Sequence, residues 1–195
     1  MGPYPRATGK QKCLLVETNY FTKWVEIESL SNIGGVDAKR FIWRNIITRV
    51  GVLHTLISNN GLQFDNKTFR RYCGELGIRN RYSTPIYPQG NGQAEATNKA
   101  IVSRLKKMLD DTKGKWVDEL PHVLWTYHTT PQRSIGETHF SMTYGAEAVI
   151  PIELGLSTLR TDQFSAEENN RLLSDIRDVV EERREVAVLK VAHYQ

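Results

Sequence analysis

Two polar residues in the middle of the chain have a spacing that suits a metal-dependent active site. Asn59 follows a run of aliphatic and β-branched residues in the stretch LISNNGLQF, residues 56–64, and Glu95 lies in the first turn of a predicted helix. They are separated by 35 residues, 60–94. In a chain that folds as strand, helix, strand, loop and helix, both positions can reach the same end of a sheet. Carboxylates placed in this way can hold two divalent metals for phosphoryl transfer.

The amide of Asn59 is the unusual member of this pair. Sites for two divalent metals use hard oxygen ligands, usually carboxylates. Asn59 offers a metal one neutral oxygen, which binds more weakly than a carboxylate and contributes no charge. Two other acids, Glu17 and Asp65, could be considered as substitutes. We expect each of them at the surface or at the end of a hairpin instead.

The elements that must position these residues alternate between strands and helices. This alternation predicts an α/β fold, with a mixed sheet and helices packed on its faces. The loop TPIYPQGNGQ, residues 84–93, contains two prolines and two glycines and therefore separates the last strand from the helix of Glu95. The predicted strands are residues 13–18, 24–30, 54–58 and 78–83, and the predicted helices are 37–50, 67–76, one from residue 94 onward, 116–127 and 169–195.

The apolar positions of these elements predict the core. The periodicity of each strand and helix places its apolar residues on the inner face. The tryptophans, Trp24, Trp43, Trp116 and Trp125, also lie in apolar patterns, which favours packing in the core over stacking on bases. We expect these side chains to be buried: Leu14, Val16, Ile57, Phe69, Leu76, Ile101 and Leu105.

Composition sets wider bounds on function. The 195 residues are 39% hydrophobic and 25% charged, with 26 basic and 22 acidic residues, so the net charge of +4 by itself barely favours a nucleic-acid partner. No apolar run approaches the roughly 18 residues of a membrane span, and the N-terminus lacks the order of a signal peptide. Cys13 and Cys73 form no metal-binding or disulfide pattern. We expect an intracellular protein with no membrane partner.

Five ordered motifs carry a family resemblance that runs from about Gly2 to the C-terminus. The chain resembles the integrase catalytic core of gypsy-type LTR retrotransposons, within the retroviral integrase superfamily, and the plant elements in particular. The motifs are NYFTKWVE (19–26), LISNNGLQF (56–64), PQGNGQAEATN (88–98), LPHVLWTYHTT (120–130) and GETHFSMTYGAEAVIP (136–151).

This resemblance implies a fold and a chemistry. The fold is a ribonuclease H-like mixed sheet flanked by helices, with a core domain over residues 1–160 and a C-terminal helical extension over 161–195. The family uses a D,D-35-E triad with Mg or Mn to trim the ends of the element's DNA and join them to chromosomal DNA. Asn59 takes the second catalytic position, and Glu95 takes the third and is the matched metal ligand. The first aspartate would fall before residue 1, so we expect truncation at the N-terminus, a degenerate site and metal that is weakly bound or absent.

The resemblance also implies DNA as a partner. In related integrases the helix of Glu95 contacts the DNA end of the element, and Asn98, Lys99 and Lys106 lie on one polar edge of that helix. Tyr87, Gln89 and Asn91 of the preceding loop are further candidates for DNA contact. A nuclear location and a homodimer are implied as well. Two alternatives stay open: a polynucleotidyl transferase active within a longer intact polyprotein, or a co-opted DNA- or protein-binding module.

Overall fold

The protein is described by a computed structural model, and the description covers residues 2, 4–59, 61–83, 99–101, 103, 116–132, 135–149 and 164–193. Two compact units are present. The first comprises Met1–Tyr20 and Val25–Leu124, and the second comprises Phe21–Trp24 and Trp125–Gln195. No helix among the described residues has the length and apolarity needed to cross a membrane.

An antiparallel hairpin begins the first unit. Strand β1 (Cys13–Thr18) pairs with β2 (Val25–Leu30), with Cys13 opposite Leu30 and Thr18 opposite Val25. Successive residues of a strand point to opposite faces, and the neighbours Leu14 and Leu15 are both buried. Strand β1 is therefore covered on both faces at this point.

A single helical stretch with a change of winding follows the hairpin. It consists of α1 (Gly35–Phe41), the π-helical segment η2 (Ile42–Ile47) and α2 (Thr48–Val50). Gly51, with φ of 89°, ends it in a conformation that favours glycine. Its inner face contributes Ala38, Phe41, Ile42 and Ile46 to the core.

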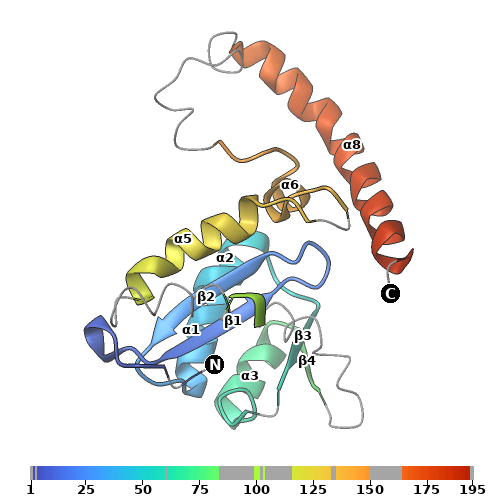
Figure 1. Cartoon of the computed structure of the whole chain (residues 1–195). Coiled ribbons are helices and arrows are strands. Elements are labelled where there is room, and N and C mark those ends of the chain that lie inside the picture. The colour runs from blue at the N-terminus through green and yellow to red at the C-terminus, as the bar shows by residue number, and fades with distance from the viewer. Residues whose placement is uncertain are drawn as a thin grey trace. The chain divides into compact units, whose positions relative to one another are not determined.

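A βαβ unit completes the described core of the first unit. Strand β3 (Thr55–Ser58) is followed by helix α3 (Lys67–Glu75) and by strand β4 (Arg79–Tyr82), which pairs with β3 in parallel. Gly77, with φ of 70°, provides the left-handed turn after α3. Figure 1 shows each pair of strands side by side, β1 with β2 and β3 with β4.

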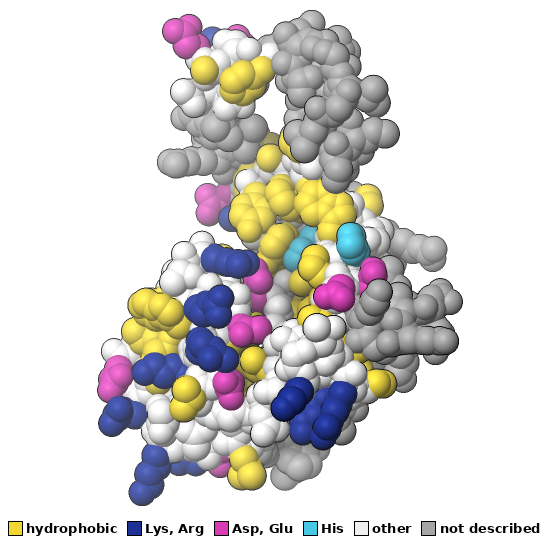
Figure 2. All heavy atoms as spheres, turned by 90° about the vertical axis from the view of Figure 1, so that its left-hand side faces the viewer, with side chains coloured by type: hydrophobic (Ala, Val, Ile, Leu, Met, Phe, Trp, Pro, Cys, Tyr) yellow, Lys and Arg dark blue, Asp and Glu magenta, His cyan; other side chains and the backbone are white. Residues whose placement is uncertain are grey.

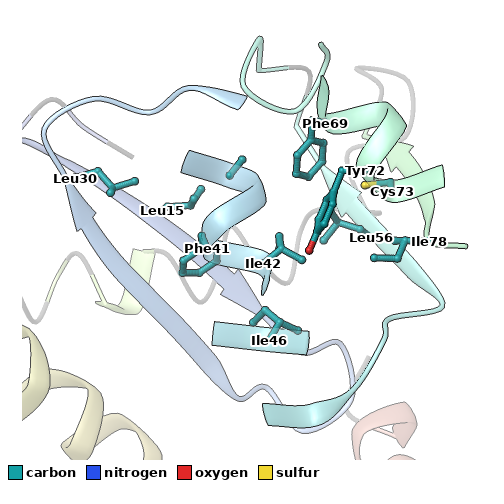
Figure 3. Close-up of a cluster of buried hydrophobic side chains, with 11 residues drawn as sticks. Leu15, Leu30, Phe41, Ile42, Ile46, Leu56, Phe69, Tyr72, Cys73 and Ile78 are labelled. Carbon is teal, nitrogen blue, oxygen red and sulfur yellow. The ribbon is translucent and has the colours of Figure 1, made fainter. Parts of the chain in front are cut away.

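The expected mixed sheet is present as two fragments. The described strands form one antiparallel and one parallel sheet of two strands each, with no hydrogen-bonded neighbour between them. Both fragments nevertheless contribute to one apolar cluster, because Leu15 and Leu30 pack in the same core as Leu56 and Ile78. Figure 3 shows these side chains gathered with Phe41 at the end of α1 and with Phe69 of α3. The predicted mixed sheet is thus shown in part, as one antiparallel and one parallel pair of strands.

The predicted core is confirmed in part. Leu14, Phe69 and Ile101 are buried, while Val16 and Leu76 are partly buried. The expectation for Ile57 is wrong, since it is 42% exposed and its neighbours Leu56 and Ser58 occupy the inner face of β3. The outer and inner faces of this short strand are thus exchanged relative to the prediction. Leu105 lies outside the described residues.

The four tryptophans also differ in how far they are buried. Trp116 is fully buried, and its Nε1 donates a hydrogen bond of 2.9 Å to the carbonyl of Pro5, within the first unit. Trp24 stacks on His128 with 3.7 Å between ring centroids, within the second unit. Trp43 and Trp125 are 49% and 39% exposed, so the prediction that they lie in the core is wrong. Their helices carry more apolar residues than one inner face can bury.

The described C-terminal part is helical. Helix α5 (Trp116–Thr129) contains Pro121, and α6 (His139–Tyr144) and α8 (Ala166–His193) follow. Arg184 of α8 donates hydrogen bonds to the carbonyls of Met142 and Thr143, at 3.2 and 3.1 Å. These contacts fasten α8 to the end of α6 within the second unit. The predicted C-terminal helix, 169–195, agrees with α8 apart from its bounds.

Candidate active-site loop

Asn59 lies directly after strand β3 and is exposed. Its side-chain Oδ1 accepts a hydrogen bond of 3.2 Å from the backbone N–H of Gly61. This is a local turn of the kind that asparagine side chains stabilise. The one oxygen that Asn59 could offer to a metal therefore already serves the backbone of its own loop.

The loop after Asn59 is closed by a second set of hydrogen bonds. The carbonyl of Gly61 accepts from the N–H groups of Phe64 and Asp65, at 2.9 and 3.1 Å. Asn66 then caps helix α3, because its Oδ1 accepts from the N–H of Phe69 at 2.9 Å. The other end of the same amide donates to the carbonyl of Gln63 at 2.9 Å. One side chain thus fixes both the loop and the start of the helix.

Strand β4 holds the same loop from the side. Tyr82 donates its hydroxyl to the carbonyl of Phe64 at 3.0 Å, and Asn80 donates to the hydroxyl oxygen of Tyr82 at 2.8 Å. Arg70 of α3 forms an ion pair with Asp65, and its hydrogen bond to that carboxylate raises the pKa of the guanidinium. Sequence patterns alone did not indicate these roles. The position of Asn66 just before an amphipathic helix is the one signal that could have indicated a cap.

Of the other predicted site residues, Lys99 alone belongs to the described part of the chain. Lys99 begins a described helical segment and is exposed. The remaining candidates lie outside the described residues, so the structure gives no distance from Asn59 to any of them. They are Glu95, Tyr87, Gln89, Asn91, Asn98 and Lys106.

The two alternative acids have other surroundings. Asp65 is held at the surface by Arg70, as expected for a structural role. Glu17 is partly buried on β1 and stands opposite Glu26 of β2. Burial, and then the charge of Glu26, raise the pKa of Glu17 to about 7. Among the residues that the structure describes, neither acid belongs to a cluster of carboxylates that could hold a metal ion.

The described residues do not fit a two-metal site. Nowhere in the described part of the chain do three or more His, Cys, Asp or Glu side chains come together in a way that could hold a metal ion. Asn59 adds a neutral oxygen that is already hydrogen bonded. Adjacent divalent cations need several negative ligands to offset their mutual repulsion, and the described donors do not supply them.

Curated proteins with similar sequences are polyproteins of retroviruses and of a transposon. The Pro-Pol polyprotein of Simian foamy virus type 1 is 31% identical over 133 residues, 68% of this chain and 11% of the relative. The Gag-Pol polyprotein of Gibbon ape leukemia virus is 32% identical over 154 residues, 78% of this chain and 9% of the relative. The Transposon Tf2-3 polyprotein of Schizosaccharomyces pombe is 22% identical over 164 residues, 84% of this chain and 12% of the relative. The chain thus spans about a tenth of the length of these relatives, and no protein-family model matches it.

Solved structures with the same fold are integrases. The catalytic core domain of BIV integrase has a TM-score of 0.57 and 22% identity, covering 70% of this chain and 87% of that one. The HTLV-2 integrase catalytic core domain in complex with magnesium has a TM-score of 0.56 and 21% identity, covering 66% and 82%. A simian T-cell lymphotropic virus intasome in complex with PP2A regulatory subunit B56 gamma has a TM-score of 0.61 and 21% identity, covering 71% and 50%.

These likenesses define the class of the protein. The chain has the α/β, ribonuclease H-like fold of an integrase catalytic core, with a fragmentary sheet. More specifically, it is a homologue of the integrase core that retroviral and retrotransposon polyproteins carry.

Proposed function

We propose that this chain is a catalytically degenerate integrase core from a gypsy-type LTR retrotransposon, which retains nucleic-acid binding and acts in the nucleus. The observation that carries the proposal is the state of Asn59. At the second carboxylate position of the resemblance stands a neutral amide, and its oxygen accepts a hydrogen bond from Gly61. The five sequence motifs support the gypsy-type origin, and the homologous transposon polyprotein supports an origin in a mobile element.

Loss of metal chemistry follows from charge. A relative, the HTLV-2 integrase core, has been solved in complex with magnesium. In this chain, Glu95 is the one acid at a matched position, and Asn59 contributes no charge beside it. An amide oxygen is a poor replacement for a carboxylate in holding Mg or Mn. We therefore expect neither end processing nor strand transfer by the chain as it stands.

A second candidate function is activity within a longer polyprotein. The two sheet fragments favour this function. Among the described strands, β1 and β3 each have a strand partner on one edge only, while the faces of β1 are already covered. Both fragments share one core, so an added strand could pair with them without a new core. In this case the first aspartate would be supplied from outside the present sequence.

A strand-transfer assay with Mg or Mn separates these functions. We expect no product from the parent chain, and none from Asn59→Asp, although the variant should bind metal more tightly because two carboxylates can share one cation. Product should require Asn59→Asp together with an N-terminal extension that carries an aspartate three residues before Gly2. Adding Glu95→Gln to that protein should abolish the product.

The parent chain provides the outcome that would contradict the proposal. If the unmodified protein joins DNA ends and Glu95→Gln removes that activity, the site is not degenerate and another acid has taken the place of Asn59. Glu17→Gln and Asp65→Asn would then identify that acid. If the extended Asn59→Asp protein joins DNA ends and the parent does not, the result supports the loss of an ancestral function.

DNA binding is expected to be weak, independent of sequence and sensitive to salt. Lys99 is exposed, and Lys106 belongs to the same predicted helix edge. On the face shown in Figure 2, Lys and Arg side chains are interspersed with Asp and Glu, so the small basic excess forms no single patch there. Such a surface contacts a few phosphates and reads no bases.

Charge reversal tests this interface. In fluorescence anisotropy with a random duplex, Lys99→Glu with Lys106→Glu should remove most of the binding at low salt. Two lost phosphate contacts should reduce the slope of log K against log salt by about 1.8. Arg171→Glu with Arg183→Glu on α8 is the matched control, since it makes the same change in net charge at two exposed positions. Equal losses in both double variants would show a general charge effect and no binding edge.

Self-association is a further proposal. Homologous assemblies include a trimeric and a dimeric form of the HTLV-2 integrase core and an intasome. In this chain, Trp43 and Trp125 expose 49% and 39% of their surface, and exposed aromatic residues are enriched in protein interfaces. We propose that these side chains contribute to a homodimer. The same surfaces would serve a co-opted protein-binding module.

A further inference from the structure

One face of the β1–β2 hairpin carries three glutamates. Residues directly opposite in an antiparallel pair share a face, and here Glu17 stands opposite Glu26 while Leu15 stands opposite Glu28. The Glu17–Glu26 rung is followed by one more rung, Thr18 with Val25, before the strands end. Two acids therefore face each other close to the loop that connects β1 and β2.

The three glutamates on this face differ in their hydrogen-bond partners. Glu26 accepts a hydrogen bond of 2.9 Å from Arg49 of α2, and Glu28 accepts one of 3.0 Å from Asn45 of η2. Within the part of the chain that the structure describes, the side-chain carboxylate of Glu17 has neither a hydrogen-bond donor nor an ion-pair partner. The titratable residues on this face of the hairpin are Cys13, Glu17, Glu26 and Glu28. The helical stretch 35–50 adds Arg49, which contacts Glu26, and its other charged residues are Asp37, Lys39, Arg40 and Arg44.

The ionisation of Glu17 acts against the pairing of the strands. A like charge directly opposite destabilises an antiparallel rung, and a partly buried carboxylate without a partner also loses hydration. Arg49 is already engaged by Glu26. Glu17 is therefore best accommodated in its neutral form, and the burial and the charge of Glu26 raise its pKa to about 7.

We propose that the Glu17–Glu26 rung is a proton-sensitive closure of the β1–β2 hairpin. With Glu17 protonated, the last rungs are closed. With Glu17 ionised, the two carboxylates repel each other and the end of the hairpin opens more often. The loop that this rung closes presents Tyr20 and Phe21, which are 72% and 39% exposed. The order of that loop then changes across neutral pH, independently of any catalytic activity.

Hydrogen exchange by NMR tests this closure in the whole chain. Protection factors, in which the intrinsic effect of pH is divided out, are measured for β1 and β2 amides at pH 5 and pH 8. In the parent, protection at the Glu17–Glu26 and Thr18–Val25 rungs should fall by about 10- to 100-fold as Glu17 ionises. Glu17→Gln should remove this fall. Glu28→Gln is the matched control and should keep it, because Glu28 stands opposite Leu15.

A direct titration covers the case in which the glutamine variant folds poorly. The side-chain carboxyl of Glu17 is followed by NMR in the parent protein, where a midpoint near 7 is expected. A midpoint near the ordinary value of 4.5 would overturn the proposal. The same conclusion would follow if protection in the parent did not change with pH, or if Glu17→Gln lost protection as steeply as the parent.

Discussion

Replacing Phe41 by alanine is expected to lower the free energy of unfolding by about 3 to 5 kcal/mol. Phe41 is 1% exposed and lies in the cluster that receives side chains from both sheet fragments. Its removal leaves a cavity that Leu15 and Leu30 on one side, and Leu56 on the other, cannot fill without moving the strands. Urea unfolding followed by circular dichroism measures the change.

Val36 provides the control for this prediction. It lies on the same helix as Phe41 but is 68% exposed. Val36→Ala should therefore change the free energy of unfolding by no more than about 0.5 kcal/mol. A loss below about 1 kcal/mol for Phe41→Ala would mean that the two sheet fragments are not joined through this core.

The Glu17→Gln variant is expected to be more stable than the parent at pH 8.5, by up to about 3 kcal/mol. The fold raises the pKa of Glu17 from 4.5 to about 7, so the folded protein holds this proton more tightly than the unfolded chain does. The resulting stabilisation is complete below pH 4.5, is lost as the pH rises towards 7 and does not return above it. Glutamine stays neutral throughout and keeps the rung free of repulsion.

The difference in the free energy of unfolding between the parent and Glu17→Gln separates the titration of Glu17 from that of other groups. Urea unfolding of the parent and of Glu17→Gln is compared at several pH values between 4 and 9. The difference in the free energy of unfolding should grow through the range from pH 4.5 to 7 and then level off. Glu28→Gln should show no such growth. A difference that is the same at pH 4 and pH 9 would contradict the assignment of the raised pKa to Glu17.

The sequence predicts elements well where local periodicity and burial agree. The apolar run that begins at Cys13 predicts a strand over residues 13–18, and β1 has these bounds in the structure. Gly51 and Gly77 end their helical segments as expected. Strand β3 shows where this reasoning fails. It has four residues with Leu56 and Ile57 side by side, so the pattern does not decide which of them faces inward. The fold places Leu56 and Ser58 inside, and a polar residue there could not be predicted from hydrophobicity.

The prediction that Trp43 is buried fails for a different reason. Ala38, Phe41, Ile42 and Ile46 fill the inner face of this helical stretch, so Trp43, the residue after Ile42, lies on another face and is 49% exposed. Helix α6 was not predicted, although its signals are present. Thr138 caps it by accepting from the N–H of Ser141 at 2.9 Å, and Gly145 ends it with φ of 77°.

The sequence predicts where the candidate site lies but not all of its contacts. The strand that ends at Ser58 correctly places Asn59 in a loop at the end of β3. The hydrogen bond from Gly61 to Asn59 depends on backbone conformation, and the contacts of Asn80 and Tyr82 depend on the parallel pairing of β4 with β3. These are tertiary effects that a local pattern does not contain.

The hydrogen bond between Trp116 and Pro5 has a consequence for the order of events during synthesis. It joins residues that are 111 positions apart, and the ring of Tyr4 packs against the same indole with 5.4 Å between centroids. A ribosome releases the N-terminal segment long before it releases Trp116, because domains are made from the N-terminus onward. The hairpin can form early from neighbouring residues, whereas the segment before it has no indole to bind until α5 emerges. A nascent chain stalled ahead of residue 116 should therefore expose Tyr4 to proteases that the finished protein resists.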